Sequence, residues 1–168
     1  LPRLAGPGAM TPDNARELDA LCRQYSIALI PMLNTLGHCG ELLATQRHQH
    51  LTEYKPPEDQ RVVRPFNLCA SRPETHRLVY GMLDDLMDCF SAPAIHVGGD
   101  EVSCIGECPV CKRASKNATA ADRYCRYYGR ILEHLARRGR RGGIWGDMLL
   151  HQTKDKSEKE CGDNYTFH

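Results

Sequence analysis

Two adjacent carboxylates follow two glycines near the middle of the chain, in the segment Gly98-Gly99-Asp100-Glu101. The residues before them, Ala94 to Val97, predict a short strand that runs into the glycines. Glycine lets a backbone approach a ligand closely, and functional groups in α/β folds gather at the carboxyl ends of parallel strands. Because neighbouring carboxylates repel each other when both are ionised, we expect one of them to hold its proton near neutral pH and serve as a general acid. From these residues alone, the alternative is that both only cap a following helix.

A thiol-rich segment comes next, with Cys104, Cys108 and Cys111. A Cys-x-x-Cys pair can hold zinc when two more ligands join it, take part in thiol exchange, or serve only the local structure. Because the sequence contains no clear second pair, we expect a local structural role, with no bound metal and no other cofactor. The chain has nine cysteines, and this odd number excludes a complete set of internal disulfides. We expect a reduced chain in the cytoplasm.

Helical and extended patterns alternate along the chain, and this order predicts an α/β fold with parallel strands built from βα units. Helices are expected to begin after Thr11, after a capping box at residues 71–74 and near Ala120, the last of them closed by Gly139. The helical spacing of that last segment predicts that Tyr124, Tyr127, Ile131, Leu132 and Leu135 point inward. Strands are expected at residues 27–33, 94–97 and 143–145, the first of them an apolar run typical of a strand buried on both faces. Residues 48–66 predict a loop. We expect one domain over residues 1–150 and a polar, disordered tail over 151–168.

The composition narrows the range of partners. Of the 168 residues, 22 are Lys or Arg and 21 are Asp or Glu, which gives a net charge of +1. This balance argues against nucleic acid or an anionic membrane as the main partner. No apolar run approaches the ~20 residues that a membrane span needs. The sequence gives no indication of the oligomeric state, and its start at Leu1 without Met leads us to expect a piece of a longer chain.

Three segments, in order, resemble strands of glycoside hydrolase family 20, the β-N-acetylhexosaminidases. The stretch from His96 to Glu101 resembles the family's active-site strand. Residues 30–38 are similar to the preceding strand, which ends in Pro-Gly-His or Phe-Gly-His where this chain has Leu-Gly-His. Residues 144–149 are similar to the following strand, which ends in Trp and then a carboxylate. Residues 68–71 and 106–108 resemble the intracellular, hexosaminidase D-like branch. The diguanylate cyclases also carry Gly-Gly-Asp-Glu, but their next residue is Phe and not Val, and their βα order differs.

The resemblance implies a role for each candidate residue. Glu101 would be the general acid/base, and Asp100 would orient the sugar's 2-acetamido group, whose carbonyl oxygen attacks the anomeric carbon. Trp145 would form a wall of the sugar pocket, and Asp147 would accept a sugar hydroxyl. His38 would support Glu101 through a polar relay. The predicted substrate-binding residues are His38, Trp145, Asp147, Asn34 (where many members carry Asp) and His96, which would pack beneath the site.

The family fold is a (β/α)₈ TIM barrel of about 250 residues. The chain matches about strands 3 to 5 with their helices, so the resemblance implies part of such a barrel. The implied activity is that of an exo-β-N-acetylhexosaminidase, which removes terminal N-acetylhexosamine from a carbohydrate by a substrate-assisted retaining mechanism. Two alternatives stay open: a catalytically incomplete fragment or pseudoenzyme of the same fold, and a zinc-stabilised binding module built on Cys104, Cys108 and Cys111. Linkage and the choice between gluco and galacto sugars also stay open.

Overall fold

The computed structural model describes residues 6, 8–53, 67–102 and 104–150. The predicted tail and most of the predicted loop therefore lie outside the described residues. None of the described helices is long and apolar enough to span a bilayer. The elements in chain order are α1 (Pro12–Gln24), α2 (Gly40–Leu43), the 3₁₀ turn η1 (Gln49–Leu51), α3 (Pro73–Cys89), β1 (Ala94–His96), α4 (Pro109–Ala114), α5 (Ala120–Arg137), β2 (Arg141–Gly143) and α6 (Asp147–Leu150).

Three extended segments lie side by side in parallel, which confirms the predicted βα arrangement. β1 pairs with β2 so that His96 lies opposite Gly143. On its other edge, His96 forms a parallel bridge with Met32. Beyond the last residue of β2 the pairing continues, since the Trp145 amide donates to the Gly98 carbonyl at 3.0 Å. β2 begins at Arg141, two residues earlier than predicted, and this continuation still carries the chain alongside the segment after β1.

Among the predicted strands, the segment at residues 27–33 differs most from the prediction. In residues 27–33 only Met32 forms a bridge, and the exposed fractions of Ile27, Ile30 and Met32 are 55%, 52% and 50%. The prediction that this run is buried on both faces is therefore wrong for the described residues. Pro31 has no N–H to donate to a ladder. In the described part of the chain, α1 packs against α3, and the side chains of Ile27, Ile30 and Met32 remain exposed.

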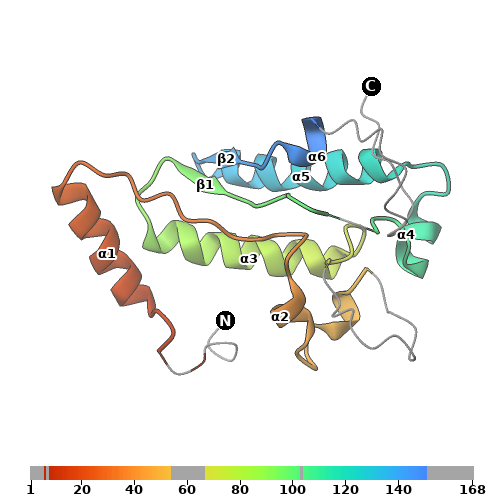
Figure 1. The fold of residues 1–168 in the computed structure, drawn as a ribbon, viewed down its shortest axis with the longest axis horizontal. Helices are drawn as coiled ribbons and strands as arrows, with labels where there is room; N and C mark the ends of the chain where they lie inside the picture. The colour runs from red at the N-terminus through yellow and green to blue at the C-terminus, as the bar shows by residue number, and fades with distance from the viewer. Residues whose placement is uncertain (1–5, 7, 54–66, 103, 151–168) are drawn as a thin grey trace.

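Helices α3 and α5 run alongside the strands (Figure 1), and together they supply eight of the 18 buried residues of the main core cluster. The predicted apolar face of α5 is confirmed for Tyr124, Tyr127, Ile131 and Leu135, which are all buried, whereas Leu132 is only partly buried. The predicted start of α1 is confirmed as well, with the Thr11 side chain accepting a hydrogen bond from the Asn14 amide.

The predicted capping box before α3 is absent. Arg72 is the N-cap of α3, and it makes no side-chain capping bond. The Ser71 hydroxyl lies 3.0 Å from the Cys111 sulfur instead, so a tertiary contact replaces the local one.

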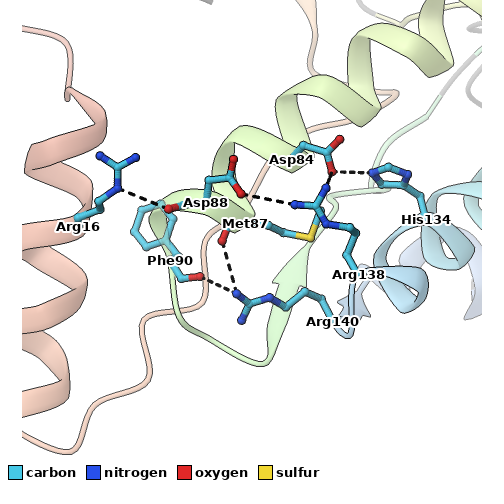
Figure 2. Close-up of polar contacts among 8 residues, drawn as sticks. All are labelled: Arg16, Asp84, Met87, Asp88, Phe90, His134, Arg138 and Arg140. Carbon is cyan, nitrogen blue, oxygen red and sulfur yellow. Dashed lines mark hydrogen bonds and ion pairs between the residues drawn. The ribbon is translucent and has the colours of Figure 1, made fainter.

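Polar contacts connect the two long helices at the amino ends of the strands (Figure 2). The Arg140 guanidinium donates to the carbonyl oxygens of Met87 and Phe90 at the end of α3. Asp84 of α3 accepts hydrogen bonds from His134 and Arg138, at 2.9 and 3.0 Å. Because Phe90 precedes β1 and Arg140 precedes β2, this cluster holds the strands at the end opposite to Gly98.

Candidate active site

The carboxyl ends of the three parallel segments bring the predicted residues together. Glu101 follows β1, and its amide donates to Asp147 Oδ2, beyond β2, at 3.1 Å. Asn34 follows the first segment, and its Oδ1 lies 2.6 Å from where a Cβ on Gly98 would stand. Carboxylates and an amide from three stretches of sequence therefore meet at one edge of the sheet, as expected for a site in a parallel α/β fold.

The backbone at this edge is held in conformations that L-residues rarely adopt. Gly98 and Gly99 have φ of 73° and 102°, and Glu101 and His38 have φ of 47° and 54°. Glycine was expected here so that a ligand could approach, but the close neighbours belong to the protein itself. A Cβ on Gly99 would lie 2.7 Å from Ile144 Cγ1. Left-handed conformations at non-glycine residues such as Glu101 and His38 are typical of functional sites.

His38 lies between the two neighbouring carboxylates. Its Nε2 is 3.2 Å from Asp100 Oδ2 and 3.5 Å from Glu101 Oε2. The Glu101 side chain is 74% exposed, whereas that of Asp100 is 29% exposed. A protonated imidazole at this place would offset the repulsion between the carboxylates, and a neutral one could exchange a proton with either. The arrangement thus supplies one carboxylate that reaches solvent and one that is more enclosed.

Three acceptor oxygens around this edge have no hydrogen-bond partner among the described residues. They are Asn34 Oδ1, Asp100 Oδ1 and Asp147 Oδ1, all shielded from solvent. An unsatisfied buried polar atom costs about 1–3 kcal/mol. Such atoms call for an explanation, and a ligand that donates N–H or O–H groups is one. The site is therefore suited to a molecule with several donors, as a sugar is.

Trp145 is half-exposed beside these acceptors, with an exposed fraction of 47%. Its ring lies 4.6 Å from that of His96, at an angle of 58°. His96 Nδ1 accepts a hydrogen bond from the Gly98 amide at 3.2 Å. His96, predicted to bind substrate, thus contacts the indole and the glycine turn in this structure.

Two tyrosines of α5 contribute to the site and were predicted only as core residues. The Tyr124 hydroxyl donates to the Gly99 carbonyl at 2.8 Å, and the Tyr127 hydroxyl donates to the Thr35 carbonyl at 2.6 Å. The Thr35 hydroxyl in turn donates to the Val97 carbonyl. Helical spacing predicted that these side chains point inward, but nothing in the sequence indicates which carbonyl each one meets.

A second cluster lies under the segment that follows Glu101. Cys108 and Cys111, which the sequence singled out, are joined there by Cys69 and Glu53. Cys104, predicted as the third thiol, is disulfide-bonded and lies outside this group, so the expectation of a reduced chain is wrong at this residue. Burial raises the pKa of the Cys108 thiol, while the hydrogen bond from Cys69 lowers that of Cys111 to about 7. Cys69 and Glu53 stand far from Cys111 in the sequence, so no spacing pattern could have found them.

Comparisons with known proteins agree with the resemblance. The profile of the glycosyl hydrolase family 20 catalytic domain matches residues 4–162. A beta-hexosaminidase of Akkermansia muciniphila is 25% identical over an alignment 146 residues long, which covers 82% of this chain and 29% of that protein. The structure of a β-N-acetylhexosaminidase from Bacteroides fragilis NCTC 9343 aligns with a TM-score of 0.70 and 22% identity, over 86% of this chain and 30% of the other. A mutant β-hexosaminidase of Streptomyces plicatus in complex with its product GlcNAc aligns with a TM-score of 0.60 and 18% identity, over 86% and 26%.

The chain thus spans less than a third of the length of these relatives. The solved structures confirm the predicted fold, part of a TIM barrel with parallel strands. Because the family profile matches nearly all of the sequence, the chain belongs to glycosyl hydrolase family 20, as part of its catalytic domain.

Proposed function

We propose that the protein carrying this chain is an exo-β-N-acetylhexosaminidase that removes terminal N-acetylhexosamine by a substrate-assisted retaining mechanism. One observation carries the proposal: three shielded, unpartnered acceptors surround the strand end that bears Asp100 and Glu101. A sugar with an amide and several hydroxyls supplies the donors that these oxygens lack. The family and the names of the relatives support the same activity.

Glu101 acts as the general acid and then as the general base. Its carboxyl is the more exposed of the pair, so it can reach the glycosidic oxygen of a bound substrate. It protonates that oxygen as the bond breaks, and later takes a proton from the water that completes the reaction. His38 Nε2 lies 3.5 Å from its Oε2 and helps to orient the carboxyl before the first step.

Asp100 positions the nucleophile that the substrate itself supplies. Its Oδ2 faces His38, which leaves Oδ1 to accept the N–H of the 2-acetamido group. With that N–H held, the acetamido carbonyl oxygen points at the anomeric carbon and attacks it. The neighbouring position of the two carboxylates suits this mechanism, because neither has to reach the opposite face of the ring as in two-carboxylate glycosidases.

The remaining residues shape the sugar pocket. Trp145 offers an aromatic face to the apolar C–H surface of the pyranose, with His96 packed against it. Asp147 Oδ1 accepts a sugar hydroxyl, while its Oδ2 holds the Glu101 amide. Asn34 Oδ1 provides a further acceptor beside Gly98.

The test compares Glu101→Gln with the unaltered protein, expressed from the full open reading frame. On a methylumbelliferyl β-N-acetylhexosaminide we expect kcat/KM to fall at least ~10²-fold, the scale of general acid catalysis. On the dinitrophenyl glycoside the loss should be smaller, because that leaving group departs without a proton. Equal activity of the two proteins on both substrates would contradict the role of Glu101.

A second measurement tests the nucleophile. Fluorination of the substrate's acetamido methyl weakens the carbonyl oxygen as a nucleophile, so the rate should fall steeply from N-acetyl to N-trifluoroacetyl substrates. A rate that does not respond to fluorination would refute substrate assistance while leaving a hydrolase in place. The 168-residue chain assayed alone decides whether this segment is active or is a catalytically incomplete part of the barrel.

We propose carbohydrate as the partner, with no nucleic acid and no membrane, and the cytoplasm as the location. Seven of the described cysteines, among them Cys69, Cys108 and Cys111, are free thiols, and this supports a reducing compartment, whereas the disulfide at Cys104 argues for an oxidising one. Fractionation of cells that produce the protein tests the location, and recovery in the secreted fraction would contradict it.

A further inference from the structure

Four potential ligand atoms from three separate stretches of sequence converge beneath the segment that follows Glu101. Glu53, Cys69, Cys108 and Cys111 each offer one such atom, and all four atoms lie within 4.8 Å of one another. The Cys69 sulfur is 3.3 Å from that of Cys108 and 3.5 Å from that of Cys111. The Cys111 sulfur is 3.3 Å from Glu53 Oε2.

These distances are close to those around a tetrahedral zinc ion. With Zn–S bonds of about 2.3 Å, two sulfurs of a tetrahedron stand about 3.8 Å apart. The observed separations fall short of this by about half an ångström or less, a difference that rotation of the cysteine side chains can supply. Zinc prefers three thiolates and one carboxylate to the all-oxygen sets that calcium and magnesium prefer.

The surroundings already fix the orientation of these side chains. Glu53 Oε1 accepts hydrogen bonds from the amides of Gly106 and Cys108, at 2.8 and 3.0 Å, which turns Oε2 toward the sulfurs. The Cys111 amide donates to the Cys108 sulfur at 3.3 Å. Outer contacts that hold the ligands in place in this way are typical of protein metal sites.

Burial gives a further reason for a cation at this place. All four residues are buried, and Glu53 is only 2% exposed. A carboxylate enclosed to this degree is costly unless it is paired or coordinates a metal. Three thiols in contact with it would, as thiolates, add negative charge that a divalent cation neutralises.

We propose that Glu53, Cys69, Cys108 and Cys111 bind one zinc ion in a closed, structural site. All four positions of the tetrahedron come from the protein, which leaves none for a reacting water. The ion connects the segment after Glu101 to the segments that carry Glu53 and Cys69. Because the zinc site rests on the ligand geometry, it does not depend on the proposed glycosidase activity.

The ion would restrain a backbone segment in which several residues have unfavourable left-handed conformations. Between Gly98 and Gly106, positive φ occurs at Gly98, Gly99, Glu101, Cys104 and Gly106. Such a segment holds its shape only when its ends are fixed. Cys108 follows Glu101 by seven positions, so an ion bound at Cys108 restrains the carboxylate at short range.

The test measures bound metal in the protein expressed from the full open reading frame and purified under reducing conditions without chelator. We expect one zinc per chain by elemental analysis. Replacement with cobalt should give the visible bands of tetrahedral cobalt and a thiolate charge-transfer band in the near ultraviolet. Cys69→Ser and Cys111→Ser should each weaken zinc binding at least about tenfold in a competition titration. Cys125→Ser, at an exposed cysteine of α5, is the matched control and should leave zinc binding unchanged.

Glu53→Gln covers the case in which a cysteine variant does not fold. The amide oxygen can still accept from Gly106 and Cys108, so the fold is retained while the anionic ligand is lost, and zinc affinity should fall at least about tenfold. The proposal is wrong if the unaltered protein contains no stoichiometric metal and takes up neither zinc nor cobalt. It is also wrong if Cys125→Ser lowers zinc binding as much as Cys69→Ser does, or if peptide mapping of protein purified without oxygen finds a disulfide between Cys69 and Cys108.

Discussion

The strongest geometric constraint at the candidate site is the lack of a side chain at Gly98, and Gly98→Ala tests it. A Cβ at this position would lie 2.6 Å from Asn34 Oδ1 and 3.3 Å from Asn34 Cα. The residue also has φ of 73°, in the left-handed region. The substitution should therefore destabilise the fold at the point where the first extended segment meets the end of β1.

Two costs add up in this variant. Holding alanine in the left-handed region costs roughly 1–2 kcal/mol. Forcing a methyl group against a packed neighbour costs about 1–3 kcal/mol. The free energy of unfolding should thus fall by about 2–5 kcal/mol, a large part of the total of about 5–15 kcal/mol for a typical protein.

Urea unfolding followed by circular dichroism measures this change, with a constant slope showing that stability alone has changed. Gly81→Ala is the matched control, because nothing lies within 4 Å of its position in α3 and the variant should gain about 0.5–1 kcal/mol. In an Asn34→Ala background, Gly98→Ala should cost less, since the nearest atom is gone. If Gly98→Ala behaves like Gly81→Ala, the close approach of the two segments is wrong.

Two further predictions concern the site and the core. Asp147→Ala removes the acceptor of the Glu101 amide, and since a hydrogen bond to a charged group contributes about 1.5–3 kcal/mol, kcat/KM should fall about 10- to 100-fold. Asp147→Asn keeps an acceptor oxygen and should lose less, so equal losses in the two variants would argue against the positioning role. Burial lowers the pKa of His76 below its ordinary value of 6.5, because the neutral imidazole is favoured in the folded state. The contribution of this neutral imidazole to stability is therefore complete above about pH 6.5 and is lost as the pH falls toward the pKa of the folded state. The free energy of unfolding, measured by urea titration at each pH, should therefore drop on acidification by up to about 1.4 kcal/mol per pH unit, and His76→Gln should flatten that slope. An unchanged slope would exclude His76 as the cause.

Much of the framework could be predicted from the sequence because local patterns determine it. Helical spacing placed Tyr124, Tyr127, Ile131 and Leu135 on the buried face of α5. The order of helices and strands was sufficient to predict parallel pairing, and parallel pairing brings strand ends to one edge. The residues expected at that edge came from three short segments that resemble the family, with Asp100 at the centre.

Contacts between distant parts of the chain account for what the sequence did not reveal. The apolar run at residues 27–33 looked like a buried strand, but its burial depends on neighbours on both faces, which local composition does not determine. Ser71 and Glu74 fit a capping box, yet Ser71 meets Cys111 instead. The predicted thiol cluster consisted of Cys104, Cys108 and Cys111, whereas in the structure Glu53 and Cys69 take the place of Cys104.

The turn from Gly98 to Gly106 is stabilised by side chains from distant parts of the chain. Its left-handed residues other than glycine, Glu101 and Cys104, each cost roughly 1–2 kcal/mol, so the turn is not stable by its own preferences. Tyr124 holds it at the Gly99 carbonyl, Asp147 at the Glu101 amide and Glu53 at the Gly106 amide. These three side chains come from α5, from the start of α6 and from the residues after η1, so the position of Glu101 depends on contacts from every side of the turn. Removal of any of these three side chains should therefore disturb the proposed catalytic carboxyl before it unfolds the chain, and kcat/KM should fall in these variants while the circular dichroism spectrum is retained.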